Sequence, residues 1–61
     1  MENRLTTSEK VVIELKRRKM TQAKLGVELG LERVSITNRI SSNAWKPLEI
    51  FYMKNKLGFD L

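Results

Sequence analysis

Between two isoleucines four residues apart, the chain carries side chains that can donate and accept hydrogen bonds. Ile36 and Ile40 have the spacing of one buried face of a helix from about Arg33 to Ser41. Arginine can bridge guanine, asparagine can bridge adenine, and hydroxyl groups can bond to bases or phosphates. Such a surface suits the edges of nucleic-acid bases, although any solvated helix face is also polar. The candidates for base contacts are Arg33, Ser35, Thr37, Asn38 and Arg39.

A shorter helix precedes this one and has a clear start and end. Thr21 is a good N-cap, because its hydroxyl can accept a hydrogen bond from a free backbone N–H one turn later. Leu25 and Leu29 share one face, and Gly30 can take the left-handed conformation that ends a helix. The two segments together predict a helix, a sharp turn and a second helix over residues 21–41.

From about Val11 to Leu61 the chain resembles the Cro and lambda-repressor type of helix-turn-helix domain, a family that includes phage repressors and xenobiotic-response-element-type bacterial regulators. The resemblance implies an all-α domain of four to five helices that binds operator DNA as a homodimer and represses transcription. It rests on Thr21-Gln22, on the spacing of Leu25-Gly26 and Leu29-Gly30-Leu31, and on the step Lys46-Pro47 into a last helix ending at Leu57-Gly58.

Two positions depart from the family's commonest pattern. Gly26 stands where Ala is usual, and we expect this exchange of small residues to be harmless. Glycine inside a helix costs about 1 kcal/mol relative to alanine, a cost that is easier to tolerate where another backbone approaches closely. The chain also has one extra residue between Gly30 and Ile40, which places an insertion near residues 32–34.

Several side chains near the ends of the two helices suit phosphate groups. Gln22, on the first turn of its helix, is the leading candidate, because side-chain donors and the positive end of a helix both favour phosphate. The further candidates for phosphate contacts are Thr21, Lys24, Asn43 and Lys46.

Positive charge is concentrated around this region. Residues 16–46 hold eight basic and two acidic residues, whereas the rest of the chain has a net charge of −1. Such a field attracts phosphates whatever the sequence and makes binding depend steeply on salt. For the run from Lys16 to Lys19, the alternative is a set of cations that simply stabilises a helix C-terminus.

Length and composition narrow the possible functions. Sixty-one residues allow one domain, residues 1–61, and a domain of this size is marginally stable alone. The chain has no cysteine and no histidine, so it lacks thiolate ligands, disulfides and the commonest general base. We therefore expect no enzyme activity, metal, cofactor or small-molecule ligand. The chain shows no membrane span, and its first four residues lack the apolar core of a signal peptide, so we expect a cytoplasmic protein of a bacterial or phage-infected cell.

The remaining segments read as a helical scaffold. Thr6 and Glu9 form a capping-box pattern that opens a first helix to about Lys19, and Pro47 suits the first turn of a last helix that Gly58 stops. The apolar residues that these segments supply are Val11, Val12, Leu15, Ile50, Phe51, Met53 and Leu57. Trp45 lies in the loop before Pro47, where we expect it to pack over the helix from about Arg33 to Ser41; the alternative is that it lies on the sugar-phosphate backbone of DNA.

The C-terminal residues predict an interface. The tail after the last helix exposes two large apolar side chains, and an unmatched apolar patch often marks an interaction surface. Since the resembling family uses its C-terminal part to dimerise, we expect a dimer interface formed by Ile50, Phe59 and Leu61. The alternative is a protein-interaction module, like an antirepressor, that uses the same fold.

Overall fold

The computed structural model describes residues 5–61; the amino-terminal residues considered for a signal peptide lie outside this range. Four helices follow one another: α1 (Thr7–Arg17), α2 (Gln22–Leu29), α3 (Arg33–Ser42) and α4 (Pro47–Asn55). No strand occurs in the described range, so the expected all-α class is confirmed. None of these four helices is long and apolar enough to cross a bilayer.

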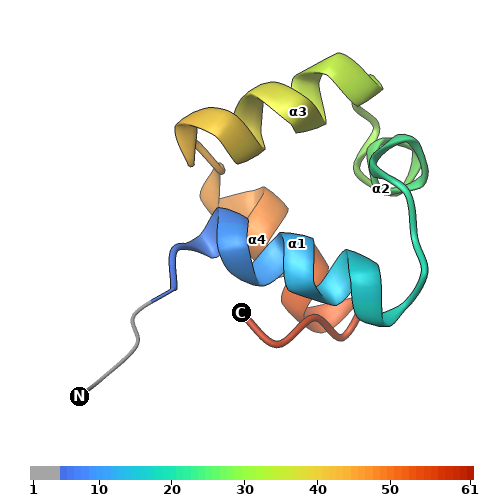
Figure 1. The fold of residues 1–61 in the computed structure, drawn as a ribbon, viewed down its shortest axis with the longest axis vertical. Coiled ribbons are helices and arrows are strands. Elements are labelled where there is room, and N and C mark those ends of the chain that lie inside the picture. Colours follow the sequence, from blue (N-terminus) through green and yellow to red (C-terminus); the bar gives the residue numbers. More distant parts are fainter. Residues whose placement is uncertain (1–4) are drawn as a thin grey trace.

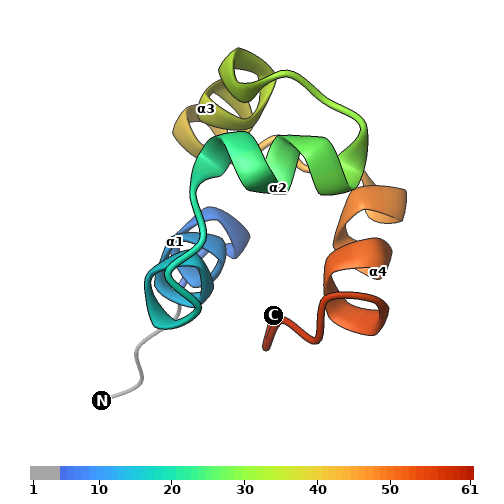
Figure 2. The same cartoon turned by 90° about the vertical axis from the view of Figure 1, so that its right-hand side faces the viewer.

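The four helices are arranged around a common centre, as Figures 1 and 2 show, and their buried apolar side chains form one core. In Figure 2, α2 lies above the space between α1 and α4, while α3 forms the upper edge of the molecule in Figure 1. α3 packs against both α1 and α2. Every helix, the segment between α3 and α4, and the C-terminal tail contribute to the core, whose buried apolar residues are Val11, Leu15, Leu25, Ile36, Trp45, Met53 and Phe59.

The N-terminal caps of α1 and α2 are confirmed. The Thr6 hydroxyl accepts from the backbone N–H of Glu9 at 3.1 Å, and the Glu9 carboxylate accepts from the backbone N–H of Thr6 at 2.7 Å. At the start of α2 the Thr21 hydroxyl accepts from the backbone N–H of Lys24 at 3.0 Å. These bonds satisfy N–H groups that a helix start otherwise leaves without partners.

α1 ends at Arg17, slightly before the expected position near Lys19. Lys19 adopts a left-handed backbone conformation with φ 53°, and Met20 then donates its N–H to the carbonyl of Leu15 at 2.8 Å. This is the hydrogen-bond pattern that usually ends a helix at glycine. Because a lysine occupies the left-handed position here, the chain carried no glycine signal for this end, and the basic run from Lys16 to Lys19 was its only local mark.

The turn between α2 and α3 is closed by backbone hydrogen bonds. Gly30 has φ 72°, and the N–H groups of Gly30 and Leu31 donate to the carbonyls of Val27 and Gly26 at 3.3 and 2.7 Å. The carbonyl of Leu31 then lies so close to α2 that a Cβ atom on Gly26 would stand 2.5 Å from its oxygen. The backbone that approaches Gly26 is therefore the turn itself. Alanine at this position is not harmless in this fold.

α4 begins at Pro47 as expected but ends at Asn55, two residues before the expected Leu57. The chain turns back at Gly58, where φ is 75°, and the N–H of Phe59 donates to a carbonyl of α4 at 2.9 Å. This turn returns the tail to the core.

Phe59 is only 3% exposed, so the expectation that the tail exposes this side chain is wrong. The guanidinium of Arg18 lies 4.9 Å from the centroid of the Phe59 ring. Arg18 also donates to the carbonyls of Leu57 and Gly58 at 3.0 and 2.7 Å. A cation over the ring and two hydrogen bonds thus hold the tail against the end of α1.

The contact at Gly26 gives a direct prediction. We expect Gly26→Ala to lower the free energy of unfolding by about 1–3 kcal/mol, because the added methyl group must displace the Leu31 carbonyl. Urea denaturation followed by circular dichroism measures this change. Ala23→Gly, at an exposed site of the same helix, is the matched control and should cost about 1 kcal/mol through helix propensity alone. A Gly26→Ala variant more stable than the parent would contradict the close approach.

The two phenylalanines offer a second test with one type of substitution. Phe59→Ala should lower the free energy of unfolding by about 3–5 kcal/mol, the range typical of emptying a buried aromatic site. Phe51→Ala should change it by less than about 1 kcal/mol, because Phe51 is 60% exposed. Thermal and urea denaturation of both variants provide the comparison. Equal losses would show that Phe59 is not part of the core of the monomer.

Candidate nucleic-acid interface

The solvent-facing side of α3 presents mainly polar groups, with Val34 as its one exposed large apolar side chain. Ile36 is fully buried and points into the core, which leaves the opposite side of the helix in solvent. Of the five expected base contacts, Arg33, Thr37 and Asn38 are exposed, Asn38 nearly opposite Ile36, Thr37 beside it and Arg33 at the start of the helix. Within residues 5–61, the side chains of Arg33 and Asn38 make no hydrogen bond or ion pair with the protein. We call the exposed residues Arg33, Val34, Thr37, Asn38 and Ser41 the outer face of α3; Ser42, the last residue of the helix, is exposed beside it.

Val34 and Ser41 were absent from the expected set, and Ser35 and Arg39 are half-buried. The helical period itself contained the missing signal. At about 100° per residue, Val34 and Ser41 lie nearly opposite the side of the helix that Ile36 marks as buried. Selecting residues for their hydrogen-bonding groups had left Val34 out.

Arg39 does not belong to the exposed face. Its Nε donates to Oε1 of Glu49 at 2.7 Å, and the two side chains are 18% and 13% exposed. Burial alone would raise the pKa of Glu49. Hydrogen bonds from Arg39 and from the backbone N–H of Lys46, together with their positive charges, outweigh this effect and lower its pKa. The ionised pair ties α3 to the first turn of α4, so the guanidinium is already occupied in this structure.

The start of α2 lies beside α3. The Thr37 hydroxyl donates to Oε1 of Gln22 at 2.7 Å, which leaves the amide NH₂ of Gln22 able to donate elsewhere. Thr21, Gln22, Ala23 and Arg33 line a hollow of about 430 Å³ at this point. Thr21 and Gln22, two of the expected phosphate contacts, therefore lie next to the exposed guanidinium of Arg33 and at the positive N-terminal end of α2.

The other end of α3 holds the remaining polar candidates. Asn43 has φ 52°, and its Oδ1 accepts from both the backbone N–H and the hydroxyl of Ser8, each at 3.0 Å. The indole N–H of Trp45 donates to the same hydroxyl at 2.9 Å, so Trp45 is packed as expected. Asn43 therefore ties α3 to α1 and retains only its NH₂ group for another partner. Lys46 is exposed just beyond it.

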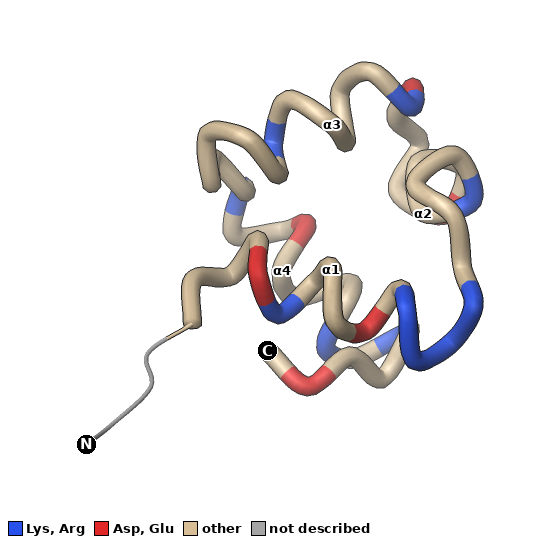
Figure 3. Tube along the Cα trace, viewed as in Figure 1, with Lys and Arg blue, Asp and Glu red and all other residues tan. Residues whose placement is uncertain are grey.

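Acidic partners neutralise part of the positive charge of residues 16–46. The carboxylate of Glu14, only 3% exposed as a residue, pairs with Arg17 and Arg18 at 3.1 and 3.0 Å. Lys24 lies 3.7 Å from Glu28 and is 58% exposed. Figure 3 shows the basic run at the end of α1 and the separate basic positions near both ends of α3. The basic residues of this region that form no ion pair within residues 5–61 are Lys16, Lys19, Arg33 and Lys46.

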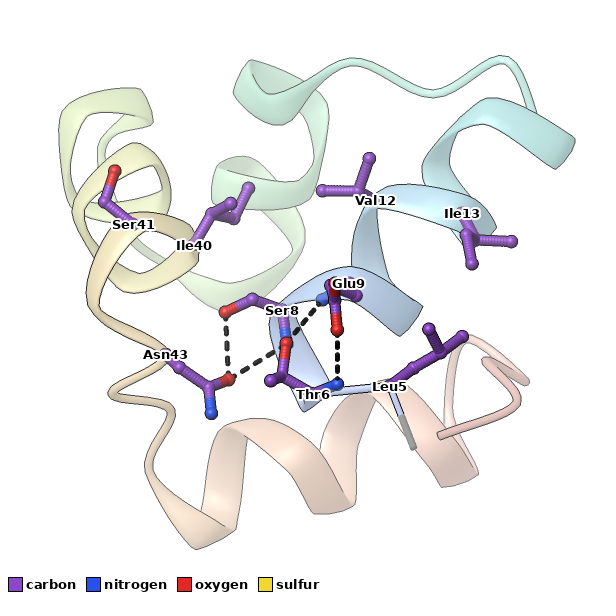
Figure 4. Close-up of a pocket in the computed structure, with 9 residues that line it drawn as sticks. All are labelled: Leu5, Thr6, Ser8, Glu9, Val12, Ile13, Ile40, Ser41 and Asn43. Carbon is purple, nitrogen blue, oxygen red and sulfur yellow. Dashed lines mark hydrogen bonds between the residues drawn. The ribbon is translucent and has the colours of Figure 1, made fainter. Parts of the chain in front are cut away.

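A larger hollow, of about 560 Å³, lies between the start of α1 and the end of α3, and Figure 4 shows the side chains around it. Its apolar wall includes Val12, Ile13 and Ile40. Most of its polar groups bond to one another, as Ser8 does to Asn43 and Thr6 to Glu9, and Ser41 is the one hydroxyl of this lining that bonds to none of them. A ligand site needs convergent polar groups that can orient a ligand. This hollow therefore carries no evident ligand chemistry.

The expected dimer residues are mostly used within the monomer. Phe59 is buried, and Ile50 and Leu61 are half-buried against the core. The exposed apolar side chains of α4 are instead Leu48 and Phe51, which are 81% and 60% exposed. Within the described range, no group of three His, Cys, Asp or Glu side chains is arranged to hold a metal ion.

No protein-family model matches this chain, and no curated protein or solved structure is significantly similar to it.

Proposed function

We propose that the chain is a sequence-specific transcriptional regulator that binds double-stranded DNA through a helix-turn-helix formed by α2 and α3, in the manner of the Cro and lambda-repressor type that its sequence resembles. The supporting observation is the outer face of α3. Its exposed hydrogen-bonding groups lie between two ends that each carry groups suited to phosphate.

The dimensions and chemistry of α3 suit the major groove. Ten helical residues span about 15 Å, and the groove is about 12 Å wide and admits one helix. In the proposed complex, Arg33, Thr37 and Asn38 contact base edges. The amide of Gln22 and the ammonium of Lys24 at one end, and the ammonium of Lys46 at the other, bond to phosphates. Phosphate contacts fix the register of the helix, and base contacts provide the sequence preference.

Regulation of this kind calls for two copies of the chain, because one helix reads only a few base pairs. A two-fold dimer places its two helices about 34 Å apart, one turn of DNA. The exposure of Leu48 and Phe51 supports a dimer contact on α4.

The same two exposed side chains also support a second candidate function, a protein-interaction module. The exposed basic residues at the ends of α3 favour DNA, and repression by occupying a promoter follows from the family resemblance.

The proposal predicts two distinct losses of DNA affinity. Asn38→Ala should weaken binding to the preferred duplex by about 1–3 kcal/mol and random duplexes much less, because a base contact is lost. Lys24→Ala should weaken all duplexes about equally and reduce the slope of log affinity against log salt by about one unit. Fluorescence anisotropy with labelled duplexes over a range of salt concentrations measures both effects.

Lys54→Ala is the matched control for Lys24→Ala, because it removes one lysine charge from α4 instead of α2. It should have little effect on the slope of log affinity against log salt. The preferred duplex comes from selection among random sequences. The DNA proposal fails if the parent protein shows no salt-dependent affinity for any duplex. The proposed docking face fails if Lys54→Ala and Lys24→Ala are equivalent.

A further inference from the structure

One exposed side chain on the outer face of α3 has no hydrogen-bonding group. Val34 is 59% exposed and is the one exposed large apolar residue within this helix. It lines a hollow of about 420 Å³ together with Glu32, Arg33 and Thr37. An isolated exposed valine is common on protein surfaces. This one, however, lies on the first turn of the surface that we propose to face the bases, where an apolar group has a specific partner.

From this position we infer that Val34 is a specificity-determining residue that contacts the C5-methyl group of a thymine. The inference rests on the proposed function. In the major groove only thymine presents a methyl group, and apolar side chains contact it. A phosphate offers Val34 nothing, since phosphate oxygens require donors or charge. The preferred site should therefore contain a thymine opposite the first turn of α3.

The local structure holds Val34 in a defined position. Valine is branched at Cβ, so in a helix it strongly prefers one χ1 rotamer. One turn later, the hydroxyl of Thr37 is committed to Gln22 at 2.7 Å, which fixes the neighbouring side chain as well. A rigid methyl surface beside an oriented hydroxyl can distinguish thymine from cytosine, which lacks the methyl group and presents an amino group instead of a carbonyl oxygen.

The test removes the methyl group from the DNA and from the protein separately. Each thymine of the preferred duplex is replaced in turn by deoxyuridine, which pairs identically but lacks the methyl group. For the parent protein, each half-site should contain one thymine whose replacement matters. Replacing that single thymine should weaken binding about fourfold, the value of one buried methyl group. The same replacement should have almost no effect on Val34→Ala, so the two changes should be strongly non-additive.

Val27→Ala is the matched control, because Val27 is 73% exposed but lies on α2. That variant should retain the full deoxyuridine effect. Circular dichroism should show that Val34→Ala keeps its helices, since alanine favours helix more than valine does.

The possible outcomes separate the two proposals. The contact at Val34 is overturned if no deoxyuridine position matters, if the losses for Val34→Ala and deoxyuridine simply add, or if selection yields no preferred sequence. In the first two cases, salt-dependent binding of the parent protein to a preferred duplex leaves the proposed function standing, whereas the lack of a preferred sequence also overturns the proposed sequence-specific binding. Absence of salt-dependent binding to any duplex overturns the proposed function and the contact together.

Discussion

The carbonyl of Leu31 packs against the α-carbon of Gly26, and the direction in which α3 leaves α2 depends on this contact. A Cβ atom at position 26 would lie 2.5 Å from that oxygen, so the turn can close so tightly only over glycine. The backbone hydrogen bond from Leu31 to Gly26 and the left-handed Gly30 hold the same turn. A rotation of α3 by one residue, about 100°, would move Ile36 out of the core. The turn therefore determines which side chains of α3 face outward.

Polar contacts hold the far end of α3. Ser8 bonds to Asn43 and Trp45, while Arg39 pairs with Glu49. Ser8 and Trp45 are buried, Arg39 and Glu49 are largely shielded from water, and their polar groups satisfy one another, an arrangement that specifies a single packing of the helices. Among the described residues that are not exposed, no buried side-chain nitrogen or oxygen lacks a hydrogen-bond partner. α3 is thus fixed at both ends, which is the rigidity that a proposed reading surface requires.

Local signals predicted the starts of helices well. The hydroxyls of Thr6 and Thr21 and the ring of Pro47 each act within one turn of their own position, so the sequence alone revealed them. The ends of α1 and α4 were harder to predict from the sequence. Lys19 adopts a conformation typical of glycine, and α4 ends before Gly58 turns the chain.

The candidate site was predictable only in part, because long-range packing decides which polar and apolar groups remain exposed. Phe59 lies 41 residues from Arg18 and, like Arg39, finds its partner through the fold. Composition cannot distinguish the buried Phe59 from the exposed Phe51. Val34 was overlooked for a different reason: base contacts were sought only among side chains with hydrogen-bonding groups, whereas the angular position of Val34 on α3 already indicates that it faces solvent.

The central claim is that the outer face of α3 and the start of α2 bind DNA. Amide chemical-shift mapping during titration of the full chain with its preferred duplex tests this most directly. The account predicts that the largest changes occur at Thr21–Lys24 and Arg33–Asn43, with little change in the second half of α4. Changes confined to the surface around Leu48 and Phe51, or no saturable change at all, would contradict it.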